Sequence, residues 1–369
     1  MIARLKIASL SEWTSGNHRP FVIAGPCSAE NEEQVLTTAK EIAEIGKISV
    51  LRAGLWKPRT NPGSFEGVGA EGFPWLRKAK EQTGLLIAVE VATPDHVKQC
   101  LDNGIDVLWI GARTTVSPFA VNDIAKVLKG QNIPVLVKNP LHPDIQLWAG
   151  AIERLNKAGI TRLAAVHRGF YSYEKTKYRN VPLWEIPIEL KRRYPTLPLL
   201  TDPSHLCGET ELISEVSQRA LDMGFDGLMI ESHFRPESAL SDARQQLTPS
   251  ALAEMLSGLK VRNIEPAPTA ESDMLESLRA IIDETDEQIL HALSRRIEVV
   301  KEIGALKKER NLTVLQIKRW NNIISSRLES GEKLGIEQKF LMKILAMVHE
   351  ESIRIQTEIM KGNGAEKKD

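Results

Sequence analysis

The chain has 369 residues, of which 42% are hydrophobic, and its 48 basic and 48 acidic residues give a formal net charge of +0. This balance argues against a general polyanion partner, and no apolar run approaches the roughly 20 residues of a membrane span. The N-terminal segment does not have the pattern of a signal peptide, and three cysteines do not make a disulfide framework. We therefore expect a cytoplasmic protein with reduced thiols.

The region from residue 21 to about residue 259 alternates apolar, β-branched runs with helix-like segments. The runs are almost continuously apolar, as expected for parallel strands that are buried on both faces. Helix-like segments such as 31–46 and 93–104 end in glycine, a common helix stop. Eight runs read as strands: 21–25, 50–54, 86–91, 107–112, 135–139, 163–168, 199–203 and 227–232. Eight βα units predict an α/β fold of the (β/α)8 TIM barrel type, although an open doubly wound sheet fits the same pattern.

The ends of these runs carry side chains that suit a metal ion. A thiol, an imidazole and two carboxylates follow strands that become neighbours once a barrel closes: Cys27, His205, Glu231 and Asp242. This donor set fits a borderline divalent ion such as Mn²⁺, Fe²⁺, Co²⁺ or Zn²⁺. Each residue alone is more often an ordinary core or surface residue. The prediction therefore depends on all four lying at adjacent strand ends, where a barrel builds its active site.

Positive side chains follow the same strand ends. The set is Arg52, Lys57, Arg59, Arg113, Lys138 and Arg168, with Pro58 and Thr60 beside Arg59. Arginine binds phosphate or carboxylate through a planar fork, and lysine supplies a compact charge. Scattered surface charges are the alternative interpretation, but a lone cation at the end of a buried strand would be costly. The pattern predicts an enzyme whose substrates carry several negative charges.

The pattern changes after residue 259. Residues 261–272 contain two prolines and no apolar periodicity, so we divide the chain into a barrel (1–260), a linker (261–272) and a helical domain (273–369). The first helix of this domain carries apolar residues at helical spacing: Leu275, Leu278, Ile282, Ile289, Leu293, Ile297, Val300 and Ile303. At about 1.5 Å per residue, the segment 273–310 would be roughly 57 Å long. Shorter helices at about 313–330 and 336–361 cannot cover that length, so we expect a homodimer through the helical domain.

The helical domain has its own group of polar side chains. Arg296 and Lys307 lie 11 residues apart, about three turns, and so project from one helix face. Arg279 lies about 25 Å before Arg296 along the axis, so one pocket cannot use both from the same chain. In an antiparallel dimer, Arg279 of one chain would reach the pocket of the other. A solvated helix face is the alternative interpretation. Further polar residues follow on the later helices: Gln316, Arg319, Trp320, Ser352 and Gln356.

Several motifs carry a family resemblance: AGPCS (24–28), KPRTNPGSFEG (57–67), GART (111–114), VKNP (137–140), HRGF (167–170), DPSH (202–205) and the pair Glu231 and Asp242. Over about residues 3–260 they resemble 3-deoxy-D-arabino-heptulosonate 7-phosphate (DAHP) synthase of the Iβ subgroup. The related synthase of 3-deoxy-manno-octulosonate 8-phosphate has an asparagine-containing motif in place of KPRT. The resemblance implies the first step of the shikimate pathway, a metal-dependent, aldol-like condensation of phosphoenolpyruvate with D-erythrose 4-phosphate.

The resemblance also implies roles for the strand-end residues. Cys27, His205, Glu231 and Asp242 would hold the divalent metal ion, which polarises the aldehyde oxygen. Phosphoenolpyruvate would be bound by Arg52, Lys57, Arg113, Lys138 and Arg168, with Lys57 also catalytic. The aldose phosphate would be held by Lys57, Pro58, Arg59 and Thr60. The ferredoxin-like N-terminal domain of some relatives is not expected, because about 20 residues precede the first strand.

A second resemblance covers about residues 273–360. The segments LRAIIDETDEQILHALSRRIEVVKEIGALKKE, VLQIKRW and EESIRIQ resemble the all-helical class of chorismate mutase, which rearranges chorismate to prephenate. This resemblance implies that Arg279 of the partner chain and Arg296 bind the two carboxylates, while Arg319 adds to the positive field. Lys307 and Gln356 would donate to the ether oxygen, and Gln316 and Ser352 would seat the substrate. Trp320 departs from the pattern, because some relatives have a glutamate there.

The fusion of the two domains predicts feedback control, in which chorismate or prephenate bound to the helical domain restrains the barrel. Two alternatives stay open at this point. In one, the helical domain serves only dimerisation and ligand sensing. In the other, the whole chain binds phosphosugars without chemistry. The choice among the four metals and any assembly beyond a dimer also stay open.

Overall fold

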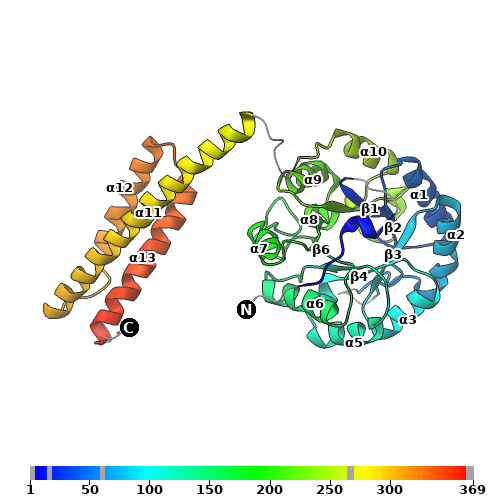
Figure 1. The fold of residues 1–369 in the computed structure, drawn as a ribbon, viewed down its shortest axis with the longest axis horizontal. Coiled ribbons are helices and arrows are strands. Elements are labelled where there is room, and N and C mark those ends of the chain that lie inside the picture. Colours follow the sequence, from blue (N-terminus) through cyan, green and yellow to red (C-terminus); the bar gives the residue numbers. More distant parts are fainter. Residues whose placement is uncertain (1–4, 15–18, 59–62, 264–269, 363–369) are drawn as a thin grey trace. The chain divides into compact units, whose positions relative to one another are not determined.

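The computed structural model describes residues 5–14, 19–58, 63–263 and 270–362. The chain divides into two compact units, Met1–Ile264 and Glu265–Asp369 (Figure 1). Arg59 and Thr60 lie outside the described residues. Within the described ranges, no helix is both long enough and apolar enough to cross a membrane.

The first unit is a closed barrel of parallel strands (Figure 1). Each strand pairs with the next along the chain, and the first pairs with the last to close the ring. The strands are β1 (Phe21–Gly25), β2 (Val50–Arg52), β3 (Leu86–Val91), β4 (Val107–Ile110), β5 (Val135–Lys138), β6 (Leu163–His167), β7 (Leu199–Thr201) and β8 (Gly227–Glu231). The predicted barrel is confirmed, and the open doubly wound sheet is excluded. Strand β7 ends earlier than expected, because Pro203 begins a short helix.

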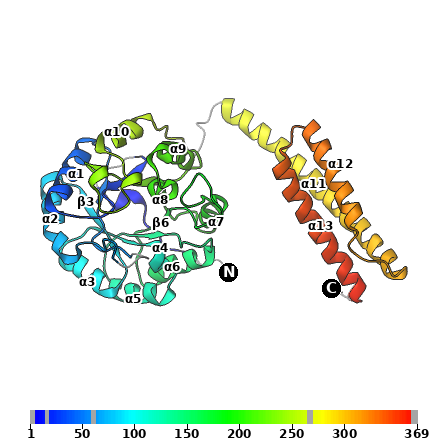
Figure 2. The same cartoon turned by 180° about the vertical axis from the view of Figure 1, so that it is seen from behind.

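Helices surround the barrel on its outside (Figure 2). They are α1 (Glu32–Glu44), α2 (Phe73–Thr83), α3 (Pro94–Asp102), α4 (Ala112–Thr115), α5 (Pro118–Leu128), α6 (Ile145–Lys157), α7 (Glu185–Arg193), α8 (Pro203–Cys207), α9 (Ile213–Asp222) and α10 (Pro249–Gly258). Short 3₁₀ turns occur at Leu10–Glu12, Gly69–Gly72, Thr210–Leu212, Pro236–Ser238 and Ala243–Gln245. Several helices begin at a side-chain cap, as where Asn31 accepts from the Gln34 N–H. Such caps fix where each helix starts after its strand.

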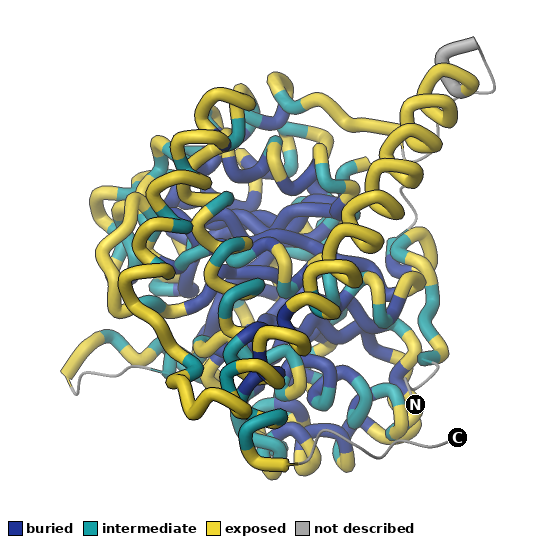
Figure 3. The backbone as a smooth tube through the Cα atoms, turned by 90° about the vertical axis from the view of Figure 1, so that its left-hand side faces the viewer, coloured by how far each residue is buried: buried dark blue, intermediate teal, exposed yellow. Residues whose placement is uncertain are grey.

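The strand residues alternate between two cores, because successive side chains point to opposite faces of a strand. In β4, Val107 and Trp109 point into the barrel, whereas Leu108 and Ile110 pack against the helices. At one end of the barrel interior Trp13 meets Phe21 edge-on, with ring centroids 6.1 Å apart. Burial of each large apolar side chain contributes about 1.5–3 kcal/mol. The buried strands thus form a rigid frame for the residues at their ends (Figure 3).

The second unit consists of α11 (Ala270–Glu309), α12 (Ile317–Lys333) and α13 (Gln338–Lys361). Helices α11 and α13 run in the same direction. Arg296 of α11 contacts Ser352 of α13, and Lys308, later in α11, contacts Ile359, later in α13. Val300 of α11 is buried, whereas all residues from 273 to 296 are exposed (Figure 3). The predicted long helix is confirmed, and its first part is not covered by the described residues of its own chain.

Candidate active sites

Strand alternation decides which strand-end side chain enters the mouth of the barrel. In β5, Leu136 points into the barrel, so Lys138, two residues later, points the same way. His167 falls on the opposite side of β6 and packs outside the barrel, 4.9 Å from the ring of Trp184. Five further side chains point the same way, because each follows an inward-pointing strand residue by two positions: Arg52, Glu90, Arg168, Asp202 and Glu231. These side chains gather at the C-terminal strand ends, where barrel enzymes place their active sites.

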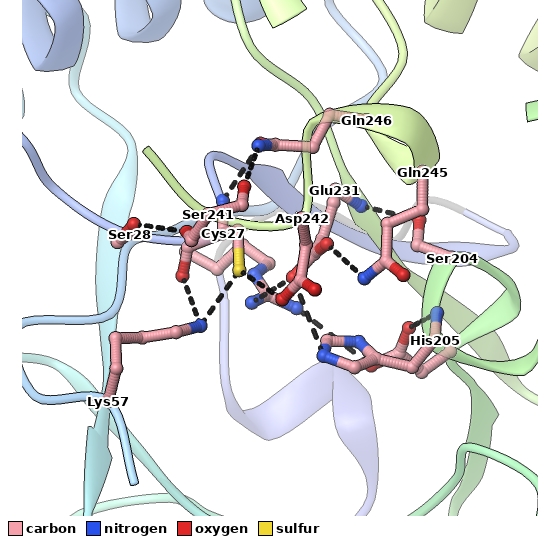
Figure 4. A network of polar contacts seen from close by, with 12 residues as sticks. Cys27, Ser28, Lys57, Ser204, His205, Glu231, Ser241, Asp242, Gln245 and Gln246 are labelled. Carbon is pink, nitrogen blue, oxygen red and sulfur yellow. Dashed lines mark hydrogen bonds and ion pairs between the residues drawn. The ribbon is translucent and has the colours of Figure 1, made fainter. Parts of the chain in front are cut away.

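Three of the predicted metal ligands meet at the seam between β1 and β8. Donor atoms of Cys27, Glu231 and Asp242 lie within 4.8 Å of one another, and Cys27 Sγ is 3.2 Å from Asp242 Oδ2 (Figure 4). Strand pairing brings them together, because Gly25 of β1 lies opposite Glu231 of β8. His205 is adjacent, with its Nε2 3.7 Å from Glu231 Oε1. A thiol, two carboxylates and an imidazole form a donor set that fits a divalent cation.

The surroundings of Cys27 and His205 favour the neutral form of both side chains. Burial raises the pKa of Cys27 to about 12; the Glu231 carboxylate adds to this shift and Lys57 opposes it. The Lys57 ammonium donates to Cys27 Sγ at 2.8 Å and to the Cys27 carbonyl at 3.1 Å. Burial also lowers the pKa of His205, and neutral imidazole is the form that ligates a metal. A cation bound here would favour the thiolate that binding requires.

Arg52 and Lys138 are buried beside this site and share a carboxylate. Arg52 Nη2 donates to Glu231 Oε1 at 3.0 Å, and its Nη1 lies 3.9 Å from Asp202 Oδ2. Lys138 Nζ donates to the same Asp202 oxygen at 2.6 Å. Both cations face the ring of Trp109, at 5.0 and 5.8 Å from its centroid. Although burial alone would raise the pKa of Asp202, the neighbouring histidine and cations hold it well below its ordinary value.

One cavity at the mouth of the barrel is lined by five of the predicted anion-binding residues, and Arg52, which is buried, is not among them. Its walls include Lys57, Pro58, Glu90, Arg113, Lys138, Arg168, Arg179, His205 and Asp242. Burial lowers the pKa of Arg168 to about 10, and the nearby charges of Arg179 and Arg113 add to the shift. Such crowding of cations favours a ligand with several negative charges. The predicted contributions of Arg59 and Thr60 fall outside the described residues.

Several polar residues that support the metal set have no role in the sequence prediction. Gln245 Nε2 donates to Glu231 Oε2 at 2.6 Å, and Gln246 Oε1 accepts from the Cys27 N–H at 3.0 Å (Figure 4). Asp202 lies inside the DPSH motif, which is its only signal in the sequence. For the two glutamines the only signal is their position shortly after Asp242 in the chain.

The second unit brings together part of the predicted mutase site. Arg296 Nη1 donates to Ser352 Oγ at 2.6 Å and to the Val348 carbonyl at 3.3 Å. Lys307 Nζ donates to the Val314 carbonyl at 2.7 Å. Gln356 is buried, one turn after Ser352 on α13, and its Oε1 has no hydrogen-bond partner among the described residues. A buried amide oxygen without a partner is costly, so it marks a place where a ligand or water would bind.

His349 is a member of this group that was not predicted. Burial lowers the pKa of His349, and the charges of Arg296 and Lys307 add to the shift. Its ring stacks on Trp320, with centroids 3.8 Å apart and planes 8° from parallel. The tryptophan that departs from the family pattern is thus packed against the site rather than free in solvent.

The remaining predicted mutase residues lie at the surface of the unit. Gln316 and Arg319, at the start of α12, are exposed. Arg279 is also exposed and forms an ion pair with Glu276 on its own helix. Within the described residues of one chain, Arg279 is therefore not brought to the group around Arg296. The role of Arg279 in the pocket of a partner chain stays a prediction.

Comparison with known proteins identifies both units. The family model of the DAHP synthetase I family matches residues 5–263, and that of chorismate mutase type II matches residues 278–357. The phospho-2-dehydro-3-deoxyheptonate aldolase of Thermotoga maritima is 32% identical over 254 residues, which cover 69% of this chain and 73% of that protein. A 2-dehydro-3-deoxyphosphooctonate aldolase of Nitratidesulfovibrio vulgaris is 27% identical over 243 residues, which cover 61% of this chain and 85% of the relative.

Solved structures agree with these matches. The crystal structure of the Thermotoga maritima aldolase, also called DAHP synthase, superimposes with a TM-score of 0.59 and 31% identity, covering 67% of this chain and 72% of that chain. A truncated form of the synthase from the same organism gives 0.57 and 29% identity, covering 67% of this chain and 91% of the other. The chain therefore belongs to the DAHP synthetase I family, and it carries a chorismate mutase type II domain after its barrel.

Proposed function

We propose that the barrel condenses phosphoenolpyruvate with D-erythrose 4-phosphate to DAHP and phosphate, and that the helical domain rearranges chorismate to prephenate. Family membership supplies the two enzyme classes, a transferase and an isomerase, and so removes the alternative of a binding protein without chemistry. The proposed substrates are supported mainly by one observation: Cys27, Glu231 and Asp242 lie close together beside a cavity lined by cations.

We assign the metal site to Cys27, His205, Glu231 and Asp242. When bound there, Mn²⁺, Fe²⁺, Co²⁺ or Zn²⁺ would supply Lewis-acid polarisation of the aldehyde oxygen. The Cys27 thiol has to lose its proton to become a ligand, and the Lys57 ammonium at 2.8 Å stabilises the resulting thiolate. His205 needs no such loss, because burial already keeps it neutral.

The cations of the cavity would hold the carboxylate and phosphate of phosphoenolpyruvate. Lys138 and Arg168 sit on rigid strand ends, and Arg113 lies in the short helix after β4. Carbon–carbon bond formation leaves positive charge on the former enol carbon, where water attacks before phosphate leaves. Fixed cations aimed at the phosphate stabilise that leaving group without reorganisation. Lys57 and Pro58, with Arg59 and Thr60, are proposed to hold the aldose phosphate.

The mutase proposal follows from the cations of the helical unit. Chorismate rearranges without an acid or base, so its catalyst must hold the reactive conformer and stabilise charge separation. Arg296 is proposed to bind a carboxylate, and Lys307 and Gln356 to donate to the ether oxygen. Gln316 and Ser352 would seat the substrate, and Arg319 would add positive potential. Arg279 is proposed to bind the second carboxylate from the partner chain.

A homodimer would complete this site. The first part of α11 exposes a series of large apolar side chains: Leu275 at 37%, Leu278 at 49%, Ile282 at 59%, Ile289 at 52% and Leu293 at 37%. A monomer rarely exposes a contiguous apolar stripe of this kind. We propose that a second copy of α11 covers it and brings Arg279 to the neighbouring pocket.

Feedback between the units is the proposed reason for their fusion. Prephenate or chorismate bound around Arg296 would lower the synthase activity of the barrel. In the full chain, saturating prephenate is expected to inhibit DAHP formation, and the Arg296→Ala variant is expected to lose that inhibition while keeping the uninhibited rate. Synthase kinetics that do not respond to either metabolite would refute this part of the proposal.

One preparation tests both activities. Release of phosphate from phosphoenolpyruvate should require erythrose 4-phosphate and a divalent metal, and Cys27→Ala should abolish it. Loss of chorismate absorbance should persist in Cys27→Ala and disappear in Arg296→Ala, so that each variant is the control for the other. A wild-type chain that forms DAHP but consumes no chorismate would identify the helical unit as a non-catalytic dimerisation and sensing module.

A further inference from the structure

The loop between β6 and α7 reaches across to the proposed metal set. Arg179 Nη1 donates to Asp242 Oδ1 at 3.0 Å and to Gln245 Oε1 at 2.7 Å. Gln245 Nε2 in turn donates to Glu231 Oε2 at 2.6 Å. A single guanidinium nitrogen is therefore linked to both carboxylates of the set, directly in one case and through one amide in the other.

These hydrogen bonds fix the rotation of the two carboxylates. Asp242 places Oδ1 on Arg179 and Oδ2 3.2 Å from Cys27 Sγ. Arg179 thus holds the carboxylate oxygen that Cys27 does not contact, and it restricts a terminal torsion that in aspartate is broad and nearly two-fold. Gln245 is oriented in the same way: its oxygen faces the guanidinium, so its NH₂ group faces Glu231.

Asn180, next in the chain, connects the same loop to the anion-binding cavity. Asn180 is buried, its Oδ1 accepts from Arg168 Nη1 at 2.8 Å, and its Nδ2 donates to the His205 carbonyl at 2.6 Å. Gly169 has a φ of +76° and lies against Asn180, where an added Cβ would come within 2.7 Å of the Asn180 carbonyl oxygen. The loop is thus held close to the barrel mouth by polar contacts that a larger residue at position 169 would disturb.

The backbone of Arg179 is held as firmly as that of its neighbour. The Arg179 N–H donates to the Cys207 carbonyl at 3.1 Å, and the Asn180 N–H donates to the Leu206 carbonyl at 3.0 Å. Gly208, with a φ of +79°, leaves room for Arg179, since an added Cβ would lie 2.6 Å from the Arg179 Cβ. The side chain of Arg179 is 49% exposed, and its guanidinium is held by Asp242 and Gln245.

We propose that Arg179, which also lines the cavity, is a positioning residue of the metal site that presets the Asp242 and Glu231 carboxylates. The inference rests on the proposed function, because it takes those carboxylates to be metal ligands. Partners of metal ligands in the outer shell typically contribute about 10- to 100-fold to metal affinity. A surface arginine without this role would contribute nothing measurable to it.

Titration with Co²⁺ of the chelator-treated full-length protein tests the proposal. The near-ultraviolet charge-transfer absorption between thiolate and Co²⁺ reports binding at Cys27 independently of activity. Arg179→Gln is expected to weaken Co²⁺ binding by about 10- to 100-fold, with an unchanged unfolding midpoint before Co²⁺ is added. Arg179→Lys, which keeps a charged donor, is expected to fall between this variant and the wild type. Lys177→Gln removes a charge from the same loop, where Lys177 pairs with Glu215, and should bind Co²⁺ like the wild type.

The other outcomes distinguish a failure of this inference from a failure of the proposed metal site. Co²⁺ affinity of Arg179→Gln within twofold of the wild type overturns the inference. An unchanged Co²⁺ affinity together with a raised KM for erythrose 4-phosphate overturns it in favour of a substrate-binding arginine. Wild-type protein that shows no thiolate-to-Co²⁺ band at all would refute the metal assignment of the proposed function instead, and the inference with it.

Discussion

Among the single residues of the barrel, Asp202 makes the most consequential contacts. Its carboxylate accepts from Lys138 at 2.6 Å, lies 2.9 Å from His205 Nδ1 and 3.9 Å from Arg52 Nη1, and is fully buried. A proposed phosphoenolpyruvate ligand and a proposed metal ligand therefore depend on one carboxylate. Removing one member of a buried ion pair leaves an uncompensated charge and costs about 3–5 kcal/mol.

Replacing Asp202 by asparagine should affect both stability and synthase activity. Asp202→Asn is expected to lower the free energy of unfolding of the barrel by about 3–5 kcal/mol and to raise KM for phosphoenolpyruvate, because Lys138 and His205 lose the negative charge that both contact. Urea unfolding and steady-state kinetics measure the two effects. Asp222→Asn is the control, since Asp222 pairs with Arg262 at an exposed site. Equal effects of the two substitutions would contradict the proposed role of Asp202.

His167 predicts a pH dependence of barrel stability. Its Nε2 contacts the Pro182 carbonyl at 2.7 Å, and burial lowers its pKa from 6.5 to about 4. Below pH 6.5 the unfolded chain binds a proton at His167 that the folded protein excludes, so stability is complete above that pH and falls as the pH drops towards 4. The total loss is on the order of 3 kcal/mol.

The measurement is the free energy of unfolding in urea at pH 7 and at pH 4.5. His167→Gln removes the ionisation and should reduce the difference between the two pH values. Exposed His142 provides the control, because His142→Gln should keep the wild-type difference. A difference that is the same in His167→Gln and in the wild type would show that other groups cause it.

The alternation of side chains along the strands predicts many residues of the barrel site. The remaining residues of the site lie in the connecting loops. The spacing of two residues from Leu136 to Lys138 and from Met229 to Glu231 can be read from the chain, because strand geometry is local and regular. The contacts of Gln245 and Arg179 cannot, since they depend on how two loops meet across the barrel mouth. No local pattern specifies such a meeting, which is why these supporting residues appear only in the structure.

At the scale of elements, α11 combines two different environments in one helix. Its last part packs closely on α13, where Gly304 lies so near Ile359 that an added Cβ would be 2.9 Å from the Ile359 Cδ1. Its first part exposes the apolar residues between 273 and 296. The length of this helix was readable from its apolar spacing, but which part its own chain covers was not, because that depends on where α13 packs.

A charge on the apolar stripe of α11 should separate the proposed dimer. Ile282→Arg is expected to give a monomer in size-exclusion chromatography with light scattering, and to remove mutase activity because Arg279 can no longer reach the partner's pocket. Glu284→Arg places the same side chain about 200° round the helix and should leave the dimer intact. A dimeric Ile282→Arg variant would show that another surface associates.

At the scale of the whole molecule, the two units are expected to unfold in separate transitions. The barrel has its own buried cores, whereas the helical unit is proposed to depend on a second chain, so dilution should lower only the helical transition. Trp320 is the one tryptophan of seven that lies in the second unit, so fluorescence follows mainly the barrel. Far-ultraviolet circular dichroism follows both. A single transition that coincides by both methods at all concentrations would contradict this expectation.

The position of the proposed metal set on the seam between β1 and β8 has a consequence for the order in which the site forms. Cys27 and Asp242 are 215 residues apart in the chain and touch only after the ring of strands has closed. Contacts of such long range form late, because the entropy of closing the loop must first be overcome. A chain still emerging from the ribosome would therefore carry Arg52, Lys138 and Arg168 well before it could capture a metal ion. Metal uptake would thus report the completion of the barrel.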